Sequence, residues 1–339
     1  MVTDINLGTR AGYRYNVSGS ISRASNDNIT GDGTTTAPVI IRGYASSITD
    51  GWQGYSSDGR LNTSNFASIT YTGGNGLLTA NSDYLQLECL NLTTSRNGAS
   101  VTMSSSGSRV IRCKIENSGT GASGLCAGPL FAFESWFIMS GASGGLYAIN
   151  LGTGGKIYGC RVKVTQAIPA ISIGSACTVT KCVIEGSGGV GIAQTTGGTG
   201  ALISDNTIYD CDGDGVDINS SVTGMVMIVN NTITDVGGYA IDSNASTVTG
   251  LFSYNRTRVH TLGQYNGSAD WHSAGDQGDV TTGGAASTDY VDAANGDLMP
   301  VATSPMINSG VLKYNNIGAL GRDQSVSSGS TQTAYAFAE

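Results

Sequence analysis

Charged side chains are scarce in this sequence, and helix-forming patterns are scarcer still. Only 12% of the 339 residues are Asp, Glu, Lys or Arg, and 5 prolines stand against 50 glycines. Apolar residues do not recur at helical spacing over more than about three turns. Ser, Thr, Asn and Gly take the polar positions instead, and these residues suit tight turns between short strands. The composition therefore predicts an all-β protein.

Basic clusters and long apolar runs are also missing. The net charge of -8 argues against a nucleic-acid partner and an anionic membrane surface, because phosphate contacts need clustered Lys and Arg. No segment is long and apolar enough to span a bilayer. The first residues show neither the basic start nor the apolar core of a secretory signal. We therefore expect no membrane partner, and either export by another route or an earlier trimmed signal.

A repeat dominates the rest of the chain. Its pattern is an apolar residue, two variable ones, a small or polar fourth residue, a variable one and a second apolar residue. Successive fourth residues are 22 to 25 positions apart. The copies are LECLNL from Leu87, VIRCKI from Val110, FESWFI from Phe133, IYGCRV from Ile157, VTKCVI from Val179, ISDNTI from Ile203, IVNNTI from Ile228 and FSYNRT from Phe252.

This period fits one coil of a three-sided parallel β-helix. We predict a single-stranded right-handed parallel β-helix of about ten coils, counting weaker copies near Ile40 and Ile69. The first apolar positions would form one internal stack. The second apolar positions, with Ile138 in the Phe133 copy, would form another. Because the step between the stacks is odd, a corner must lie between them.

The fourth residue marks that corner and predicts an internal ladder of side chains. Its occupants are Leu90, Cys113, Trp136, Cys160, Cys182, Asn206, Asn231 and Asn255. Stacked Asn residues can pass amide hydrogen bonds along the column, and Cys packs there as a small hydrophobe. The seven cysteines show no paired CxxC spacing. A zinc site and a complete disulfide framework are therefore disfavoured, and inert free thiols are expected.

Four regions follow from the repeat. Residues 1–38 are predicted to be an N-terminal cap and lead-in strand, and 39–257 the parallel β-helix. Residues 258–323 are predicted to be a loop excursion and C-terminal cap, and 324–339 a polar tail.

Two terminal segments resemble a known superfamily. The segment APVIIRGYASSITDG from Ala37 is similar to the one that opens the first full coil in pectate-lyase-like right-handed β-helices. The segment ANGDLMPVATSPMINSGVLKYNNIGALGRDQ from Ala294 resembles their closing segment. That superfamily includes polysaccharide lyases, bacterial surface proteins and phage tailspikes and other virion proteins. The Asn-Thr-Asp, Asp-Asp, Gly-His-Gly and Arg-Ile-Lys motifs of its active polygalacturonases are absent here, so no catalytic residues are assigned.

An acidic segment and a loop are the candidate sites. In DCDGDGVD, the carboxylates Asp210, Asp212, Asp214 and Asp217 alternate around glycines as in a calcium loop, although Ser221 stands where an EF-hand-like loop has Glu. Without calcium, the same segment reads as a turn that enters a strand. The segment from Arg258 breaks the repeat and gathers aromatic and polar side chains that suit a carbohydrate. Its candidate ligand-binding residues are Tyr265, Asp270, Trp271 and His272; alternatively, the loop only seals the column.

These features favour a structural or adhesive protein of a phage virion, either a capsid decoration protein or a tail spike or fibre component. Other virion proteins and further copies of the chain are the expected partners, a surface polysaccharide is a further one, and the virion surface is the expected location. The alternatives are a polysaccharide lyase or glycoside hydrolase of pectate-lyase-like fold, and a secreted or cell-surface bacterial adhesin. A lyase of this fold needs a cationic or basic side chain above metal-bound carboxylates. The outward-facing candidates are Arg112, Lys114, Arg161, Lys163 and Lys181.

Overall fold

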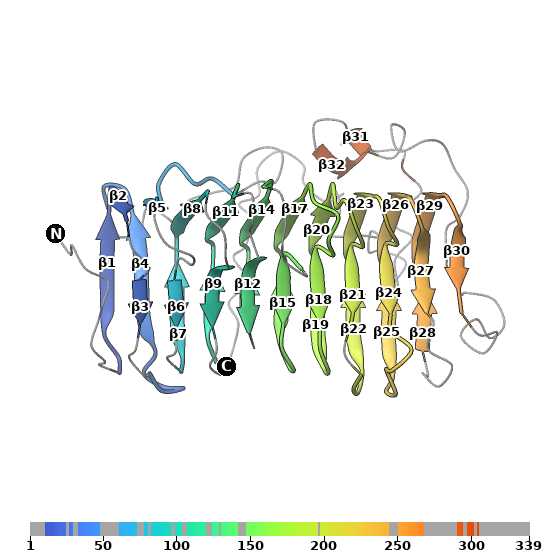
Figure 1. Cartoon of the computed structure of the whole chain (residues 1–339), viewed down its shortest axis with the longest axis horizontal. Coiled ribbons are helices and arrows are strands. Elements are labelled where there is room, and N and C mark those ends of the chain that lie inside the picture. The colour runs from blue at the N-terminus through green and yellow to red at the C-terminus, as the bar shows by residue number, and fades with distance from the viewer. Residues whose placement is uncertain are drawn as a thin grey trace, which may run out of the picture.

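Short parallel strands coil into a three-sided rod (Figure 1). The computed structural model describes residues 11–24, 27–29, 33–47, 61–72, 78–80, 83–95, 99–103, 107–119, 124–128, 130–141, 147–195, 197–243, 250–267, 290–293, 297–301 and 304. Within these ranges there is no α-helix, and so none that is long and apolar enough to cross a membrane.

Three sheets of ten strands each form the sides of the rod. Sheet A contains β1 (Arg14–Ser18), β4 (Val39–Tyr44), β7 (Leu85–Glu88), β10 (Arg109–Ile111), β13 (Phe131–Phe133), β16 (Lys156–Tyr158), β19 (Cys177–Thr180), β22 (Ala201–Ser204), β25 (Val226–Val229) and β28 (Gly250–Ser253). Sheet B contains β2 (Ser20–Arg23), β5 (Ala67–Tyr71), β8 (Leu90–Thr94), β11 (Lys114–Asn117), β14 (Trp136–Met139), β17 (Arg161–Val164), β20 (Val183–Glu185), β23 (Thr207–Cys211), β26 (Thr232–Val236) and β29 (Arg256–His260). Sheet C contains β3 (Asp27–Ile29), β6 (Leu78–Ala80), β9 (Ala99–Met103), β12 (Gly124–Gly128), β15 (Ile149–Leu151), β18 (Ile171–Ile173), β21 (Ile192–Gln194), β24 (Val216–Ile218), β27 (Tyr239–Ser243) and β30 (Gly263–Asn266).

Each strand pairs in parallel with the equivalent strand of the next coil, so the predicted fold class is confirmed. Eight regular coils run from β7 to β30, and two coils with longer connections, β1–β3 and β4–β6, precede them. The parallel strands therefore begin before residue 39 and end after residue 257. Residues 324–339, the predicted tail, lie outside the described residues.

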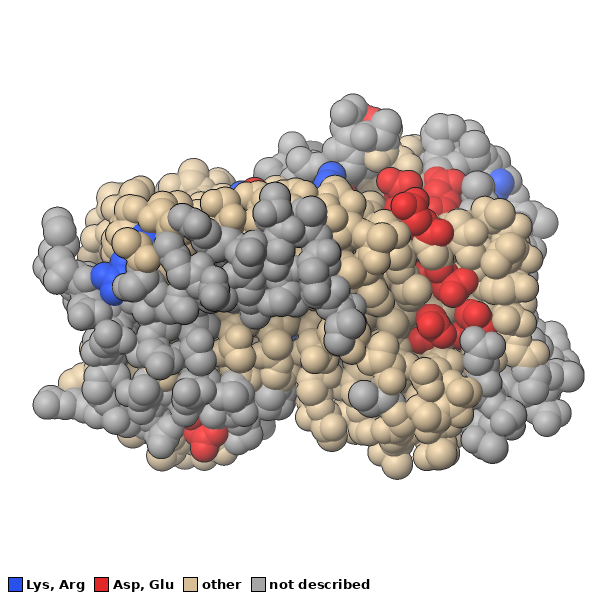
Figure 2. All heavy atoms as spheres, in the orientation of Figure 1, with Lys and Arg blue, Asp and Glu red and all other residues tan. Residues whose placement is uncertain are grey.

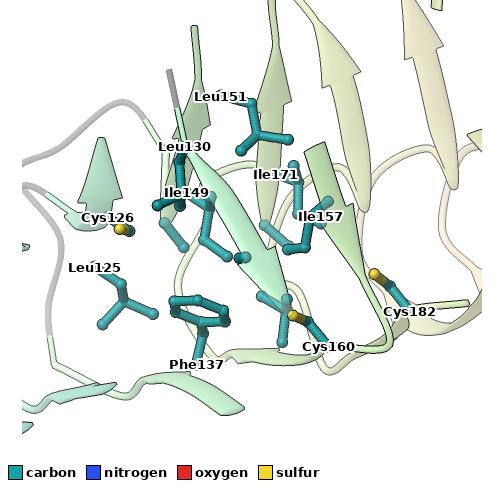
Figure 3. Packing of buried hydrophobic residues seen from close by; sticks show 14 of the residues in the cluster. Leu125, Cys126, Leu130, Phe137, Ile149, Leu151, Ile157, Cys160, Ile171 and Cys182 are labelled. Atoms are coloured by element: carbon teal, nitrogen blue, oxygen red, sulfur yellow. The ribbon is translucent and has the colours of Figure 1, made fainter. Parts of the chain in front are cut away.

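One buried column of apolar side chains fills the rod. Figure 3 shows Phe137 from β14, Ile149 from β15 and Ile157 from β16 pointing into the same interior. Outside the Phe133 copy, the first and second apolar positions of the repeat lie in register from coil to coil. Residues from all three sheets share the interior, so each coil is stabilised mainly by the coils on either side of it.

The Phe133 copy of the repeat is out of step with the prediction by one residue. In the register of sheet A, Ala132 pairs with Val110 and Ile157, and Phe133 points outward. Phe137, not Ile138, is the buried residue of the second stack. The ladder position of this coil is consequently Ser135, which is buried, and Trp136 lies outside the ladder. A small residue fits the tight corner, where an indole does not.

The corners explain the ladder. The residue before each ladder position has a left-handed backbone, with φ between 46° and 63°; these residues are Cys89, Arg112, Glu134, Gly159, Lys181, Asp205, Asn230 and Tyr254. The turn takes the next backbone N–H out of the sheet pairing, and a buried N–H needs another acceptor. The ladder side chain of the following coil supplies it: the Asn206 Oδ1 accepts from Cys182 N at 2.9 Å, and the Asn231 Oδ1 accepts from Asn206 N at 3.0 Å.

All seven cysteines are free and buried. Burial raises the pKa of the Cys126 and Cys211 thiols to about 12 and that of Cys89 to about 11. Thiols with a raised pKa carry little thiolate at neutral pH and react slowly. The cysteines are core residues in this structure.

A short antiparallel pair, β31 (Tyr290–Asp292) and β32 (Asp297–Pro300), lies against the outer face of sheet B (Figure 1). The Tyr290 side chain is almost fully buried, its hydroxyl lies 3.3 Å from the Thr234 Oγ1, and its ring meets the Tyr209 ring edge-on at 5.9 Å. This contact brings the C-terminal part of the chain to the outer face of coils β22–β27.

Candidate functional site

Aspartates from two successive coils gather at the corner between sheets B and C. Asp210, near the end of β23, has a left-handed backbone with φ 58°. Asp235 stands at the equivalent place on β26, with φ 54°. Asp is among the residues that adopt this conformation most readily. Both side chains therefore point outward, while their neighbours Cys211 and Val236 enter the core.

The turn that follows β23 carries two more carboxylates toward sheet C. Asp212 is exposed, and the Asp214 Oδ1 accepts a hydrogen bond from Tyr239 N of the next coil at 2.6 Å. Partial burial raises the pKa of Asp214, although that hydrogen bond opposes the shift. The DGDG segment, residues 212–215, is thus fixed to the neighbouring coil at its second Asp, Asp214.

Asp217 on β24 and Asp242 on β27 are register partners on the outer face of sheet C. Burial, followed by the charges of Asp242 and Asp214, raises the pKa of Asp217 to about 6. Asp242 is 9% exposed and accepts a hydrogen bond from the Asn266 Nδ2 at 3.0 Å. In this pair of neighbouring carboxyl groups, the pKa of Asp217 is thus raised well above its ordinary value.

We call Asp210, Asp212, Asp214, Asp217, Asp235 and Asp242 together the acidic strip. Figure 2 shows Asp and Glu side chains running as a band across this end of the rod. Among the described residues, no three His, Cys, Asp or Glu side chains form a group that could hold a metal ion. The four predicted calcium ligands are therefore spread along the corner and are not gathered around one point, and calcium binding stays a prediction.

Replacing Asp217 with Asn is expected to stabilise the fold at neutral pH and to change little in acid. A folded-state pKa of about 6 against an ordinary 3.8 means that the folded chain holds the proton more tightly than the unfolded chain. The stability linked to Asp217 is complete below the ordinary pKa and is lost as the pH rises through 6. Thermal unfolding across this pH range measures the effect. Asp292→Asn, at an exposed site, is the control, and an equal shift of the melting temperature at all pH values would contradict the expectation.

A pocket of about 370 Å³ opens beside the strip on the outer face of sheet B. Its walls come from three strands (β17, β20 and β23), the turns that follow them and the C-terminal segment: Lys163, Thr165, Glu185, Gly186, Ser187, Gly188, Tyr209, Asp210, Asp212 and Ala293. Lys163, Glu185 and Tyr209 are register partners on β17, β20 and β23. Asp210 and Asp212 belong to both the pocket and the strip, so the two form one continuous site.

Glu185, one of the residues that line this pocket, belongs to a buried ion pair. The Arg161 Nη2 lies 2.5 Å from the Glu185 Oε2, and both side chains are less than a tenth exposed. The Lys163 Nζ lies 3.7 Å from the other Glu185 oxygen and is half exposed. Burial and the charges of Asp235 and Asp210 raise the pKa of Tyr209. The pocket thus offers a fixed carboxylate, an ammonium group, a neutral phenol and two free-standing carboxylates.

The other predicted site is described only in part. Tyr265 lies on β30, where its ring stacks on Phe252 at 6.4 Å and packs against the core. Asp270, Trp271 and His272 lie outside the described residues. Tyr265 helps to close the apolar end of the column, and the ligand-binding group that it was predicted to join stays a prediction.

Sequence comparison assigns the family. The family model described as "Right handed beta helix region" matches residues 53–202 and 149–250, which together span more than half of the chain. The chain belongs to the right-handed β-helix family. Comparison with curated proteins gave no match.

The solved structure of a pectate lyase supports the same right-handed β-helix fold. Pectate lyase Pel9A matches with a TM-score of 0.64 and 14% identity, covering 93% of this chain and 89% of that one. An alginate lyase from Paenibacillus matches with a TM-score of 0.36 and 11% identity, covering 79% of this chain and 91% of the lyase. At these identities the likeness concerns the fold alone, because one fold hosts many activities.

The sequence analysis did not assign Glu185, Tyr209, Asp235 or Asp242 to the site. Lys163, Glu185 and Tyr209 each follow the second apolar residue of their repeat, so aligned copies place them in one outward row. Asp235 and Asp242 stand one coil after Asp210 and Asp217 in the same way. The repeat contained this signal. Nothing in it indicated that Ala293 and Tyr290 would come to the same place.

Proposed function

We propose that this protein binds a glycan in the pocket on sheet B and along the adjoining acidic strip. The observation that carries the proposal is the meeting of Lys163, Glu185, Tyr209 and two Asp carboxylates around one cavity of about 370 Å³. Binding pockets for small ligands begin at about 300 Å³. Carboxylates accept hydrogen bonds from sugar hydroxyls, and the partly exposed phenol ring of Tyr209 offers an apolar face for a pyranose.

The charge of the site favours a neutral glycan. Lys163 and Arg161 both face Glu185, so their charges are largely engaged within the protein. Asp210, Asp212 and the rest of the strip then leave the site negative. A polyanionic chain would meet like charges here, whereas hydroxyl groups would meet acceptors.

Two features favour binding without cleavage at the pocket. The raised pKa of Tyr209 keeps its phenol protonated at neutral pH, which makes it a poor base. The Glu185 carboxylate is held in the buried ion pair with Arg161. These properties suit an adhesive or structural protein with a rigid binding face.

We further propose that the protein is a component of a phage virion, either a capsid decoration protein or part of a tail spike or fibre. There it would assemble with other virion proteins and with copies of itself. A rod-like solenoid with few charges suits such a role. The test is mass spectrometry and immunogold labelling of purified particles. Detection on a bacterial envelope, and not on particles, would favour an adhesin instead.

Glycan binding is tested on an array of bacterial surface polysaccharides, followed by calorimetry with the tightest ligand. Tyr209→Ala and the double variant D210N/D212N are each expected to weaken binding about tenfold, which is ~1.4 kcal/mol. Glu116→Gln removes a carboxylate from the same sheet on β11, several coils away, and is expected to leave the affinity unchanged. Equal affinity in all of these variants would place the glycan elsewhere.

A second candidate function, glycoside hydrolysis, is favoured by Asp217 and Asp242. The two residues are register partners on neighbouring parallel strands, and the strand spacing of about 4.8 Å is close to the roughly 5 Å between the two carboxyl groups of retaining glycosidases. A pKa of about 6 suits Asp217 to a general acid. Release of reducing ends from the bound glycan, abolished in Asp217→Asn and in Asp242→Asn, is the expected result for an enzyme. If the glycan stays intact after prolonged incubation, the protein binds it without cleaving it.

A further inference from the structure

Gln194 places an amide group inside the apolar column. It ends β21 and faces inward at 1% exposure, between its register partners Ile173 on β18 and Ile218 on β24. Its Nε2 and Oε1 are both buried, and neither has a hydrogen-bond partner in the part of the chain that the structure describes. An amide of this kind can form four hydrogen bonds, two as donor and two as acceptor.

Such an amide needs partners. Burying an amide without hydrogen bonds is costly, and most buried side-chain polar atoms in folded proteins are paired with the protein or with ordered water. Internal water molecules typically occupy places where buried polar groups have no partner from the protein itself, whereas cavities with apolar walls stay dry. The burial of Gln194 therefore points to a ligand that carries hydrogen-bond donors and acceptors.

The groups around the corner between sheets C and A are already engaged. In the link from β21 to β22, the carbonyl oxygen of Thr199 accepts a hydrogen bond from Ala176 N at 2.8 Å. The Cys177 thiol, which opens the inward row of sheet A, donates to the carbonyl oxygen of Gly152 at 3.2 Å. Carbonyl oxygens keep a second lone pair for a further donor. The Gln194 Oε1, in contrast, needs a donor that these groups do not supply.

The same corner has room for a small molecule. Gln194 and Ala201 stand at the two ends of the link from β21 to β22. Ala201 is the register partner of Val226, so this coil carries the smaller side chain at a position that the next coil fills with a larger one. Ala201 is 7% exposed, and solvent therefore touches this end of its row.

A second polar group lies further along the row of Gln194. Ser243 on β27 is the register partner of Ile218, and its buried Oγ likewise lacks a hydrogen-bond partner among the described residues. The neighbouring inward row of the same strands is apolar throughout, with Ile171, Ile192, Val216 and Ile241. The unpaired polar groups of sheet C are thus confined to the row beside the corner.

We propose that Gln194 binds ordered water inside the column, at the corner between sheets C and A. The water donates one hydrogen to the Gln194 Oε1 and the other to a second lone pair of a backbone carbonyl at the corner. The Nε2 donates to a further water molecule of the same site. This hydration site lies inside the rod and does not depend on the pocket or the acidic strip.

The test is water magnetic relaxation dispersion on the full chain, which counts the water molecules that stay inside a protein for microseconds. Gln194→Met keeps the length of the side chain and removes both polar atoms, and it is expected to lower the count by at least one. Gln166→Met is the matched control, because the Gln166 Nε2 lies outside the column and donates to Ser140 O at 3.2 Å. This control is expected to leave the count unchanged.

Two further measurements bear on the same site. A high-resolution crystal structure is expected to show water density about 2.7–3.2 Å from the Gln194 Oε1. The guanidinium midpoint of Gln194→Met is expected to equal that of the parent or to fall, because the amide and its partner are removed together.

Three results would overturn the proposal. One is an equal number of long-lived waters in the parent and in Gln194→Met. Another is density that shows both atoms of the amide bonded directly to the protein. The third is a guanidinium midpoint of Gln194→Met clearly above that of the parent, which would mean that the amide is buried without any partner.

Discussion

Asn231→Ala is expected to lower the free energy of unfolding by about 4 kcal/mol. Asn231 is fully buried in the ladder. Its amide nitrogen donates to the carbonyl oxygens of Ile203 at 2.9 Å and Val229 at 3.1 Å. Its Oδ1 accepts from the backbone and side-chain nitrogens of Asn206 at 3.0 and 2.9 Å. Alanine leaves these polar groups buried without partners, and each such group costs about 1–3 kcal/mol.

The loss is expected to be local before it is global. In a solenoid each coil contacts only its neighbours, so hydrogen exchange should speed up first in β22–β29 and little in β7–β13. Asn231→Cys is expected to lose less than Asn231→Ala. The thiols of Cys113, Cys160 and Cys182 fill the same position and lie 3.3 to 3.4 Å from a carbonyl oxygen two residues earlier.

Asn150→Ala on β15 is the matched control, because that side chain is exposed. It is expected to change the free energy of unfolding, measured by guanidinium denaturation, by less than about 0.5 kcal/mol. If Asn231→Ala behaves like Asn150→Ala, the ladder does not contribute to stability in the way its hydrogen bonds indicate.

The ladder also shows how much of the fold can be predicted from the sequence. The period and the two apolar stacks predict the sheets, because a buried column requires apolar residues at the same two places in every coil. The register error at Phe133 arose because Phe133, Trp136 and Ile138 are all large and apolar, so the pattern fits in either frame. The structure resolves this by packing, since Ala132 and Phe137 together fill the interior of that coil. The ambiguity lies in side-chain size, which hydrophobicity alone does not record.

The candidate site, too, could be predicted from the sequence only in part. The acidic strip follows from the repeat, because residues one coil apart become neighbours. The wall that Ala293 adds to the pocket does not follow, since it depends on Tyr290 docking against Thr234 and Tyr209. Those contacts join segments outside the repeat to segments inside it. Periodicity carries no information about them.

Glu185→Leu is expected to cost about 3–5 kcal/mol, because it leaves the buried Arg161 guanidinium without its closest carboxylate. Arg161 is 8% exposed, so water does not readily replace that partner. Lys163 is half exposed and can turn toward solvent, so it adds little to the loss. Chemical denaturation followed by far-UV circular dichroism measures the change.

Two further variants decide whether the stability lost in Glu185→Leu comes from the charge of Glu185 or from its packing. The double variant R161M/E185L removes both charges and keeps apolar bulk, so it is expected to recover most of the stability that Glu185→Leu loses. Glu116→Leu changes the same outward row of sheet B, at a pair with Lys114 that is only partly buried, and is expected to cost less than about 1 kcal/mol. If the double variant is as unstable as Glu185→Leu, the carboxylate contributes through its packing and not through the charge of Arg161. If instead stability returns, the ion pair is retained for reasons other than stability, which fits the place of Glu185 in the wall of the proposed glycan pocket.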